Sequence, residues 1–403
     1  MKWEKVKLGE LYEVHNGLSK AGKFFGEGYP FLTFSTVFNN YFIPKQIADL
    51  VQSTEKEQES YSIRRGDVFV TRTSETSDEL GMSCVALKDY PMATYNGFTK
   101  RMRPITNRVF PEYIGYYMRL PSFRGEFRAF STMTTRASLR NEDLLGLEVE
   151  LPPIEIQKQI AEILSAYDDL IENKQTHIKL LEEAAQRLYK EWFVDLRFPG
   201  HENTKIVDGV PEGWSKSMVS EVSAVLRRGI SPKYNEKARG IVINQKCIRQ
   251  TIVSYDEART QEKKYPAELE MMESDIVICS TGAGTLGRVG QIFEAKGNAT
   301  LDSHVTLIRA NEKIGQQSLF WSLKMKQDYL MNAGKGSTNQ LELSRETIGS
   351  CEILIPERKI AEQVEKNFVA IHNKMKECSM QIARLREVRD LLLPKLMSGE
   401  VEV

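Results

Sequence analysis

The chain has 403 residues, 41% of them hydrophobic, and its 55 basic side chains are balanced by 55 acidic ones. This length predicts roughly two to three domains, while the absence of any run of about 18 apolar residues and of an N-terminal secretion signal argues against a membrane span or export. The five cysteines include no C-x-x-C pair, which indicates buried thiols in a reducing compartment. Their spacing does not match that of zinc ligands. We therefore expect a soluble, cytoplasmic protein with no metal site.

Two stretches of similar length, which open near Trp3 and Trp214, carry the same order of local signatures. Each ends in a proline step, at Pro152 and at Pro356, that leads into a long helical pattern. Several short segments correspond between the copies: Gly66–Val70 with Ser274–Ile278, Ala93–Thr94 with Ala299–Thr300, Thr134–Thr135 with Thr338–Asn339, and Leu139–Asn141 with Leu343–Arg345. Two copies of one unit predict a protein that acts at two places with a fixed separation.

The first copy contains a basic stretch over residues 99–140, in which the only acids are Glu112 and Glu126. Its cations are Lys100, Arg101, Arg103, Arg108, Arg119, Arg124, Arg128, Arg136 and Arg140. Arginine mixed with Ser, Thr and Asn suits phosphate binding and the reading of base edges, so we expect these cations on a DNA-binding surface. The alternative is an ordinary fluctuation of charge along a soluble protein.

One uninterrupted helix is predicted over residues 156–192, which contain neither Gly nor Pro. Apolar residues alternate three and four positions apart, the pattern of a coiled-coil face. The predicted face consists of Leu164, Tyr167, Ile171, Lys174, Ile178, Leu181, Ala185, Leu188 and Trp192. The polar position Lys174 can fix the register and orientation of the pair.

A linker is predicted over residues 198–212, where Pro and Gly are dense. The second copy then begins at Trp214 and carries its own basic stretch over residues 225–249, with Glu236 as its only acid. The cations are Arg227, Arg228, Lys233, Lys237, Arg239, Lys246 and Arg249. A basic stretch in both copies favours nucleic-acid binding over a chance fluctuation.

The segment Gly282–Gly287 matches the G-x-G-x-x-G pattern and directly follows a predicted strand. A dinucleotide site needs a helix after this pattern, but Arg288–Phe293 is strand-like, so we predict a flexible loop between two strands. Asp256 with Glu262–Lys264 could suggest a metal-dependent nuclease, but this charge-rich segment is expected to be exposed and such triplets are common by chance.

The second long helix is predicted to begin after Pro356 and to end at Pro394. Its apolar face consists of Val364, Phe368, Ile371, Met375, Cys378, Ile382, Leu385, Arg389 and Leu392. Because the two faces have the same length, each helix is the simplest partner for the other. If the globular units lie at opposite ends of the pair, the helices run antiparallel and a pseudo-two-fold axis relates the halves, as it relates two half-sites of duplex DNA. Packing on a single domain, or a homodimer seam, is the alternative.

Several of these segments resemble the DNA-specificity subunit of Type I restriction-modification enzymes. The resemblance covers essentially the whole chain and rests on Trp3–Glu10, Arg65–Val70, Leu151–Leu164, Gly284–Gly290, Gly336–Gln340 and Pro356–Val364. The second copy departs at Glu357–Lys359, where the family usually has another proline and apolar residues. The first departs at Met133–Thr135, where a Gly-Ser-Thr turn is common.

The resemblance implies an α+β fold with two tandem β-rich target recognition domains separated by a long antiparallel two-helix coiled coil. The implied parts are a first recognition domain (1–152), a first conserved spacer helix (153–197), a linker (198–212), a second recognition domain (213–356) and a second spacer helix with the C-terminal tail (357–403). Each domain would read one half of a bipartite DNA site, and the helices would set the spacing and dock two modification subunits.

Those modification subunits would carry S-adenosylmethionine and methylate adenine N6, and restriction subunits would add translocation and cleavage that depend on ATP and Mg2+. This chain would hold no cofactor and no catalytic residue.

Candidate DNA-binding residues lie in the paired polar loops, where Ser, Thr, Asn and Gln can bind phosphates or base edges and Arg and Lys can hold phosphates. In the first unit they are Thr71, Arg72, Ser74, Thr134, Thr135 and Arg136. In the second they are Arg227, Arg228, Lys233, Ser280, Thr281, Arg288, Lys335, Ser337, Thr338, Asn339 and Gln340. The alternative functions are a nucleotide-dependent enzyme that uses Gly282–Gly287, a helical scaffold that binds only proteins, and a stand-alone bipartite DNA-binding repressor.

Overall fold

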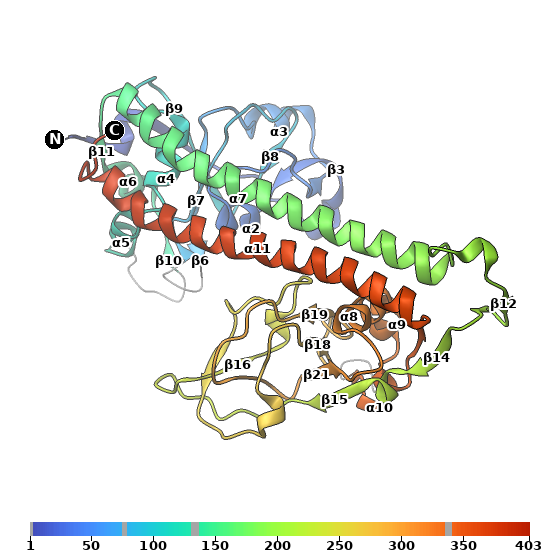
Figure 1. Cartoon of the computed structure of the whole chain (residues 1–403). Coiled ribbons are helices and arrows are strands. Elements are labelled where there is room, and N and C mark those ends of the chain that lie inside the picture. Colours follow the sequence, from blue (N-terminus) through green and yellow to red (C-terminus); the bar gives the residue numbers. More distant parts are fainter. Residues whose placement is uncertain (1–2, 75–78, 130–136, 335–340) are drawn as a thin grey trace. The chain divides into compact units, whose positions relative to one another are not determined.

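The structure is a computed structural model of the chain (Figure 1), and it describes residues 3–74, 79–129, 137–334 and 341–403. The chain forms two compact units: unit 1 is Met1–Glu172 with Ala383–Val403, and unit 2 is Asn173–Ile382. Each unit therefore contains one globule and part of both long helices, whereas the five-part division predicted from the sequence separates globules from helices. Within the described ranges, no helix is long and apolar enough to cross a membrane.

Unit 1 contains a four-stranded antiparallel sheet of order β2-β9-β5-β7 and a three-stranded sheet of order β4-β3-β8, in which β3 and β8 are parallel. Its strands are β1 (Glu4–Lys7), β2 (Tyr12–Asn16), β3 (Phe25–Leu32), β4 (Leu50–Val51), β5 (Val68–Thr71), β6 (Thr73–Ser74), β7 (Ser83–Val85), β8 (Thr94–Tyr95), β9 (Thr99–Pro104), β10 (Ala137–Ser138) and β11 (Glu148–Leu151). Its short helices are α1 (Leu8–Leu11), α2 (Phe34–Asn39), α3 (Glu55–Ser60), α4 (Pro111–Tyr117), α5 (Pro121–Ala129) and α6 (Asn141–Gly146).

Unit 2 repeats the connectivity of these two sheets. Its sheets have the orders β15-β21-β18-β19 and β17-β16-β20, with β16 and β20 parallel. The elements are β14 (Ser215–Met218), β15 (Ser223–Arg228), β16 (Gly240–Ile243), β17 (Arg259–Gln261), β18 (Ile276–Cys279), β19 (Val289–Gln291), β20 (Ala299–Leu301), β21 (Val305–Ala310), α8 (Gln316–Met325), α9 (Gln327–Asn332), α10 (Arg345–Gly349) and β22 (Glu352–Ile355). The repeat inferred from the sequence is thus confirmed.

The central strands of both units are short apolar runs that are buried on both faces. All four residues of β5 and all four of β18 are buried, and such β-branched, continuous runs favour a covered strand over an amphipathic one. In each repeat copy the opening strand pairs antiparallel with the closing one: Glu4 lies opposite Leu151 in β1 and β11, and Ser215 lies opposite Ile355 in β14 and β22. Each globule therefore begins and ends at the same place.

The two long helices are α7 (Ile154–Tyr189), which continues into a π-helical turn over Lys190–Val194, and α11 (Arg358–Met397). Every residue of the two predicted apolar faces is buried or half-buried. Both faces are therefore confirmed. Because α7 has no proline or glycine and carries its apolar residues at helical spacing, the burial of this stripe stabilises a helix much longer than its propensity alone would support.

The helices run antiparallel within each unit. In unit 1, Arg389 of α11 forms an ion pair with Asp168 of α7, and Leu396, nearer the end of α11, shares a core with Ile160, nearer the start of α7. In unit 2, the pKa of Glu377 is lowered by its hydrogen bond with Lys374 and also by the charge of Lys174 on α7.

In unit 2, the end of α7 packs against the start of α11: Ala185 and Tyr189 of α7 share a core with Val364 and Phe368 of α11. The antiparallel direction predicted for the pair is therefore confirmed in both units.

The end of α11 differs from the prediction. Pro394 lies inside the helix, which continues to Met397. A proline costs one backbone hydrogen bond and a steric adjustment, but Leu393, Leu396 and Met397 are all at most 5% exposed in the core of unit 1. Burial of these three side chains outweighs the cost of the proline, because each contributes about 1.5–3 kcal/mol.

The predicted linker is an ordered segment. Ile206–Val207 (β12) and Val210–Pro211 (β13) form a hairpin, whose turn residues Asp208 and Gly209 both have positive φ, as a type I′ turn requires. Phe198 is buried, and its ring packs against that of Trp214 with 4.7 Å between the ring centroids. The Pro- and Gly-rich composition therefore marks turns and not flexibility here.

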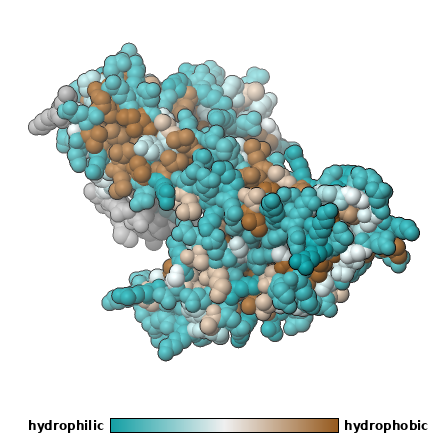
Figure 2. Space-filling view, in the orientation of Figure 1, coloured by the Kyte–Doolittle hydropathy of each residue, from teal (hydrophilic) through white to brown (hydrophobic). Residues whose placement is uncertain are grey.

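Apolar side chains are also exposed on the long helices. Figure 2 shows apolar surface gathered where the start of α7 and the end of α11 lie in unit 1. Exposed apolar residues of these segments are Ile163, Leu170, Val388 and Leu391, and those of the segments in unit 2 are Leu180, Val369 and Met380. Contiguous exposed apolar surface on a folded protein is typical of a protein interaction site.

His372 of α11 is buried in unit 2. Its Nδ1 lies 3.0 Å from Oε1 of Gln291, and its ring packs at 4.3 Å on Phe293. Burial lowers the pKa of His372 to about 4, while nearby Glu273 opposes this shift and Lys376 adds to it. The imidazole is therefore neutral near pH 7.

Mild acid is expected to destabilise unit 2 through His372. The folded-state pKa of about 4 lies below the ordinary value of 6.5, so the unfolded chain binds the proton first as the pH falls. Stability that is complete above about pH 6.5 is then lost progressively toward about pH 4. Urea unfolding of His372→Gln across this range should show a flatter pH dependence than the parent. His177→Gln, at an exposed position of α7, serves as the control, and an unchanged slope in His372→Gln would contradict the assignment.

Candidate nucleic-acid interface

Four chain segments meet at one end of the main sheet of unit 1. The carbonyl oxygen of Phe98 accepts a hydrogen bond from Arg72 N at 3.0 Å, and the carbonyl oxygen of Arg72 accepts one from Leu139 N at 2.9 Å. Gly17 N donates to the carbonyl oxygen of Thr99 at 3.2 Å. We name the segments 16–18, 71–74, 96–99 and 137–139 the unit 1 corner.

The same four segments meet in unit 2 with the same hydrogen bonds. Ser280 N donates to the carbonyl oxygen of His304 at 2.8 Å, and Leu343 N donates to the carbonyl oxygen of Ser280 at 2.8 Å. Gly229 N donates to the carbonyl oxygen of Val305 at 3.0 Å. The segments 228–230, 279–281, 302–305 and 341–343 are the unit 2 corner. The described segments of both units therefore share one backbone frame.

One glycine in each frame, Gly17 in unit 1 and Gly229 in unit 2, permits the close approach of its segments, and neither was predicted from the sequence. A Cβ at Gly17 would lie 2.0 Å from the carbonyl oxygen of Asn96, and a Cβ at Gly229 would lie 2.2 Å from that of Leu301. No side chain fits at such distances, so glycine is required for this close approach of two segments. The signal was present, since each glycine follows the first strand of its sheet and precedes an apolar residue, Leu18 or Ile230.

The predicted DNA-binding residues fall into three groups. The first group lies outside the described residues and consists of Thr134, Thr135, Arg136, Lys335, Ser337, Thr338, Asn339 and Gln340. The second group consists of Arg72, Ser74, Arg228 and Thr281, which belong to the corners, and of Arg227, Lys233 and Arg288, which lie on or near the strands of unit 2.

Thr71 and Ser280 form the third group, because both are fully buried. The Thr71 hydroxyl donates to the carbonyl oxygen of Glu79 at 2.5 Å and accepts from Met82 N at 2.9 Å, while the Ser280 hydroxyl bonds to that of Thr306 at 2.6 Å. Their hydroxyl groups therefore support the loops from inside, and a direct contact with DNA is not available to them in this structure.

Among the cations of the first basic stretch whose side chains the structure describes, most are buried or half-buried, contrary to the prediction. Arg101 and Arg124 are at most 9% exposed, and together with the half-buried Arg119 they donate to backbone carbonyl oxygens at 2.7–3.0 Å. Buried carbonyl groups outside the sheet ladders need donors, and a guanidinium provides five N–H groups. The arginines of this stretch therefore serve internal hydrogen bonding, so a high arginine content here does not by itself indicate a phosphate-binding surface.

A positive charge does remain at the unit 1 corner. Lys100 is 5% exposed and hydrogen-bonds to Oδ1 of Asn141. Burial lowers the pKa of Lys100, and the nearby charge of Arg72 lowers it further. An anion such as a phosphate beside Lys100 would oppose this shift and favour its charged form.

The basic stretch of the second copy is at the surface, as predicted, but several of its cations are paired with acids. Arg227 pairs with Glu268, Arg228 with Glu342, Lys233 with Glu262 and Arg249 with Glu257. Exposed ion pairs of this kind contribute little to stability, so these cations can exchange a carboxylate for a phosphate at low energetic cost.

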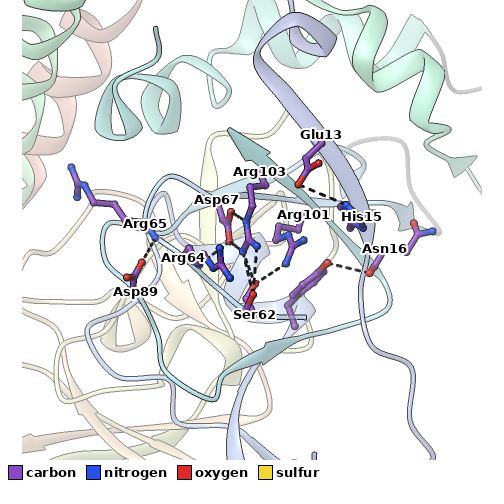
Figure 3. A network of polar contacts seen from close by, with 11 residues as sticks. Glu13, His15, Asn16, Ser62, Arg64, Arg65, Asp67, Asp89, Arg101 and Arg103 are labelled. Atoms are coloured by element: carbon purple, nitrogen blue, oxygen red, sulfur yellow. Dashed lines mark hydrogen bonds and ion pairs between the residues drawn. The ribbon is translucent and has the colours of Figure 1, made fainter. Parts of the chain in front are cut away.

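A buried ion pair supports the far end of the main sheet in unit 1 (Figure 3). Nε and Nη2 of Arg103 lie 2.8 and 2.6 Å from the two carboxylate oxygens of Asp67, and Nη2 also donates to the carbonyl oxygen of Ser62 at 3.0 Å. The Asp67 carboxylate further accepts Arg64 N at 2.8 Å and is fully buried. It thereby fixes the turn that precedes β5.

Unit 2 contains the equivalent ion pair. Nε and Nη2 of Arg309 lie 2.6 and 2.8 Å from the carboxylate oxygens of Asp275, and Met272 N donates to that carboxylate at 2.7 Å. The correspondence of Asp67 with Asp275 was visible in the sequence, but the role of these acids was not predicted. Each ion pair fixes the start of one strand, β5 in unit 1 and β18 in unit 2. The other end of that strand lies at the corner.

The glycine segment of unit 2 is a loop between two strands, as predicted. It joins β18 to β19, and Gly282, Gly284 and Gly287 all have positive φ. A Cβ at Gly287 would lie 2.4 Å from Met331 N, so this glycine permits close packing against α9. No helix follows whose N-terminus could bind a pyrophosphate.

The carboxylates considered for a nuclease do not converge on a metal site. Glu262 is paired with Lys233, and Asp256 is exposed. Among the residues that the structure describes, no group of three or more His, Cys, Asp or Glu side chains could hold a metal ion.

Comparison with known proteins agrees with this geometry. Residues 1–183 match the family model described as the Type I restriction modification DNA specificity domain. The specificity subunit of the Type I restriction enzyme MjaIX from Methanocaldococcus jannaschii is 26% identical, over 100% of this chain and 94% of that protein. The HindI specificity subunit from Haemophilus influenzae is 25% identical, over 99% of both chains.

A solved structure has the same fold. The S subunit of a Type I restriction-modification system from M. genitalium matches with a TM-score of 0.56 at 16% identity, over 98% of this chain and 96% of that chain. The α+β class and the pairing of two β-rich units with long helices are thereby confirmed. The first part of the chain thus matches the specificity-domain family, and the chain over its whole length is similar to specificity subunits of Type I restriction-modification enzymes.

Proposed function

We propose that this chain recognises a bipartite DNA target and thereby directs adenine methylation and restriction by partner subunits. The observation that carries the proposal is the duplicated corner, in which four segments are joined by the same hydrogen bonds in both units. One frame with different loop sequences suits two half-sites of different sequence. The cations at each corner supply the phosphate contacts that position a protein on DNA, and the polar loops supply base-edge contacts.

The long helices support the proposed protein partners. Their inner faces are buried against each other and against the globules, while Leu170 and Leu391 in unit 1 and Leu180 in unit 2 are 49%, 61% and 55% exposed. Apolar side chains outside the coiled-coil face suit the docking of two modification subunits, one for each unit, with restriction subunits joining the complex. S-adenosylmethionine, ATP and Mg2+ would be bound by those subunits in the cytoplasm, and this chain would position them without catalysing either reaction.

The alternative functions receive no support from the same observations. The Gly282–Gly287 loop lacks the helix that nucleotide binding needs. A scaffold that binds only proteins does not account for two equivalent corners beside polar loops. A repressor would use the same corners, and it differs from the proposal in acting without methyltransferase partners.

Mapping of methylated adenines across the genome, in cells with and without this chain, tests the proposal. The expected result is a single bipartite motif, with a fixed number of unread base pairs between its halves, that loses methylation when the chain is deleted. Methylation that is unchanged by the deletion would contradict the proposal. Specific DNA binding by the chain without any methylated motif would favour the repressor.

A further inference from the structure

We infer that Phe98 and His304, which occupy equivalent positions in the two corners, are specificity-determining residues that each read bases in one half of the DNA target. The inference rests on the proposed function and assigns base reading to a turn that the sequence reasoning had not selected. This turn is Asn96–Phe98 in unit 1 and Asp302–His304 in unit 2.

The two turns share one backbone design. Phe98 N donates to Oδ1 of Asn96 at 2.7 Å, and His304 N donates to Oδ1 of Asp302 at 2.9 Å. The carbonyl oxygens of Phe98 and His304 then accept the backbone N–H groups of Arg72 and Ser280. Since both the N–H and the C=O of each tip residue are fixed, its Cβ has the same place in both frames. The frame is thus constant, and only the side chain at the tip differs.

The side chains at the tips are accessible and chemically unlike. Phe98 is 59% exposed, so its ring is available for contact with a ligand, and its backbone carbonyl oxygen accepts the N–H of Arg72. His304 is also exposed, and its Nδ1 lies 2.6 Å from the Thr281 hydroxyl. This contact orients the imidazole and leaves Nε2 available.

These two side chains suit different bases. An aromatic ring offers no hydrogen bond but makes apolar contact with the methyl group of thymine in the major groove, whereas an oriented imidazole nitrogen can hydrogen-bond to the edge of a purine. We therefore assign thymine reading to Phe98 and purine reading to His304. Two unlike tips on one frame account for two half-sites of different sequence.

The test uses the full chain in complex with its modification subunits and a pool of duplexes with randomised sequence, from which bound molecules are recovered and sequenced. In Phe98→Ala, the preference for T·A at one position of one half-site should fall by roughly 5- to 100-fold, the effect of losing one base-pair contact. His304→Ala should relax one position of the other half-site to a similar extent. In Phe98→His, the thymine position should change toward a purine and not merely relax.

Two controls carry substitutions at the other ends of the same strands. Ile105 follows β9 and is 58% exposed, nearly the same as Phe98, and Glu312 lies exposed beyond the end of β21. Ile105→Ala and Glu312→Ala should leave the selected motif unchanged. Thermal unfolding of all variants identifies any that lose structure.

The outcomes separate this inference from the proposed function. A parent complex that selects a bipartite motif, with the same motif in both tip variants, overturns the inference and leaves the proposed function standing. A uniform loss of binding over all sequences also overturns it, because it assigns the tips to phosphate contact or to folding. A parent complex that selects no motif overturns both.

Discussion

Replacement of Asp67 with alanine is expected to destabilise unit 1 by about 3–5 kcal/mol, the cost of leaving one member of a buried ion pair without its partner. The carboxylate is fully buried and holds both the Arg103 guanidinium and the backbone N–H of Arg64. Its loss leaves a cation with a side-chain exposure of only 17% and frees the turn before β5. Hydrogen exchange of the β5 and β9 amides measures the change within unit 1.

Glu155→Ala is the matched control for Asp67→Ala. Glu155 pairs with Lys158 in the same unit at 2.9 Å, but its side chain is 74% exposed, so the expected change is at most about 1 kcal/mol. The double variant Asp67→Leu with Arg103→Met removes both charges and should recover much of the lost stability. Equal effects for Asp67→Ala and Glu155→Ala would show that burial of the pair contributes nothing.

Replacement of Phe368 with alanine is expected to cost about 3–5 kcal/mol in unit 2, since a fully buried aromatic side chain leaves a cavity that its neighbours fill only partly. Phe368 lies on the apolar face of α11, packs near Trp321 of α8, and is 0% exposed. The loss should appear as a lower urea midpoint and as faster hydrogen exchange in the segments of α11 and α7 that belong to unit 2.

The neighbouring residue provides the control for Phe368. Val369 lies on the same helix but points to solvent, with 38% exposure, so Val369→Ala should change stability by no more than about 0.5 kcal/mol. If Phe368→Ala increased hydrogen exchange in α8 but not in α11, the prediction that packing in the core of unit 2 stabilises α11 would be contradicted.

The features that the sequence predicted well are those that depend on local periodicity. The faces of both long helices could be predicted because burial along a helix recurs at a fixed spacing. The loop at Gly282–Gly287 could be predicted for a similar reason, since β-branched residues and glycine at Val289–Gln291 exclude a helix. The duplication could be recognised because both copies keep the same order of turns and strands.

The features that the sequence did not predict depend on contacts between distant segments. Whether Arg101 or Arg124 faces solvent is decided by carbonyl groups 39 and 44 residues away, which no local pattern reveals. The roles of Gly17 and Gly229 depend likewise on turns that are far along the chain. The prediction that α11 ends at Pro394 used only the intrinsic preference of proline. Burial of Leu393, Leu396 and Met397 extends the helix beyond it.

The antiparallel pairing of β1 with β11 and of β14 with β22 has a consequence for how new target sequences can arise. Because Glu4 lies opposite Leu151 and Ser215 opposite Ile355, the two cut points that would free an entire globule are adjacent in space. Genetic recombination at these points could exchange one globule for a foreign one as a cassette, since termini that lie close together favour insertion of a domain. The long helices α7 and α11 would keep their length, and a hybrid chain would recognise one half of the target of each parent.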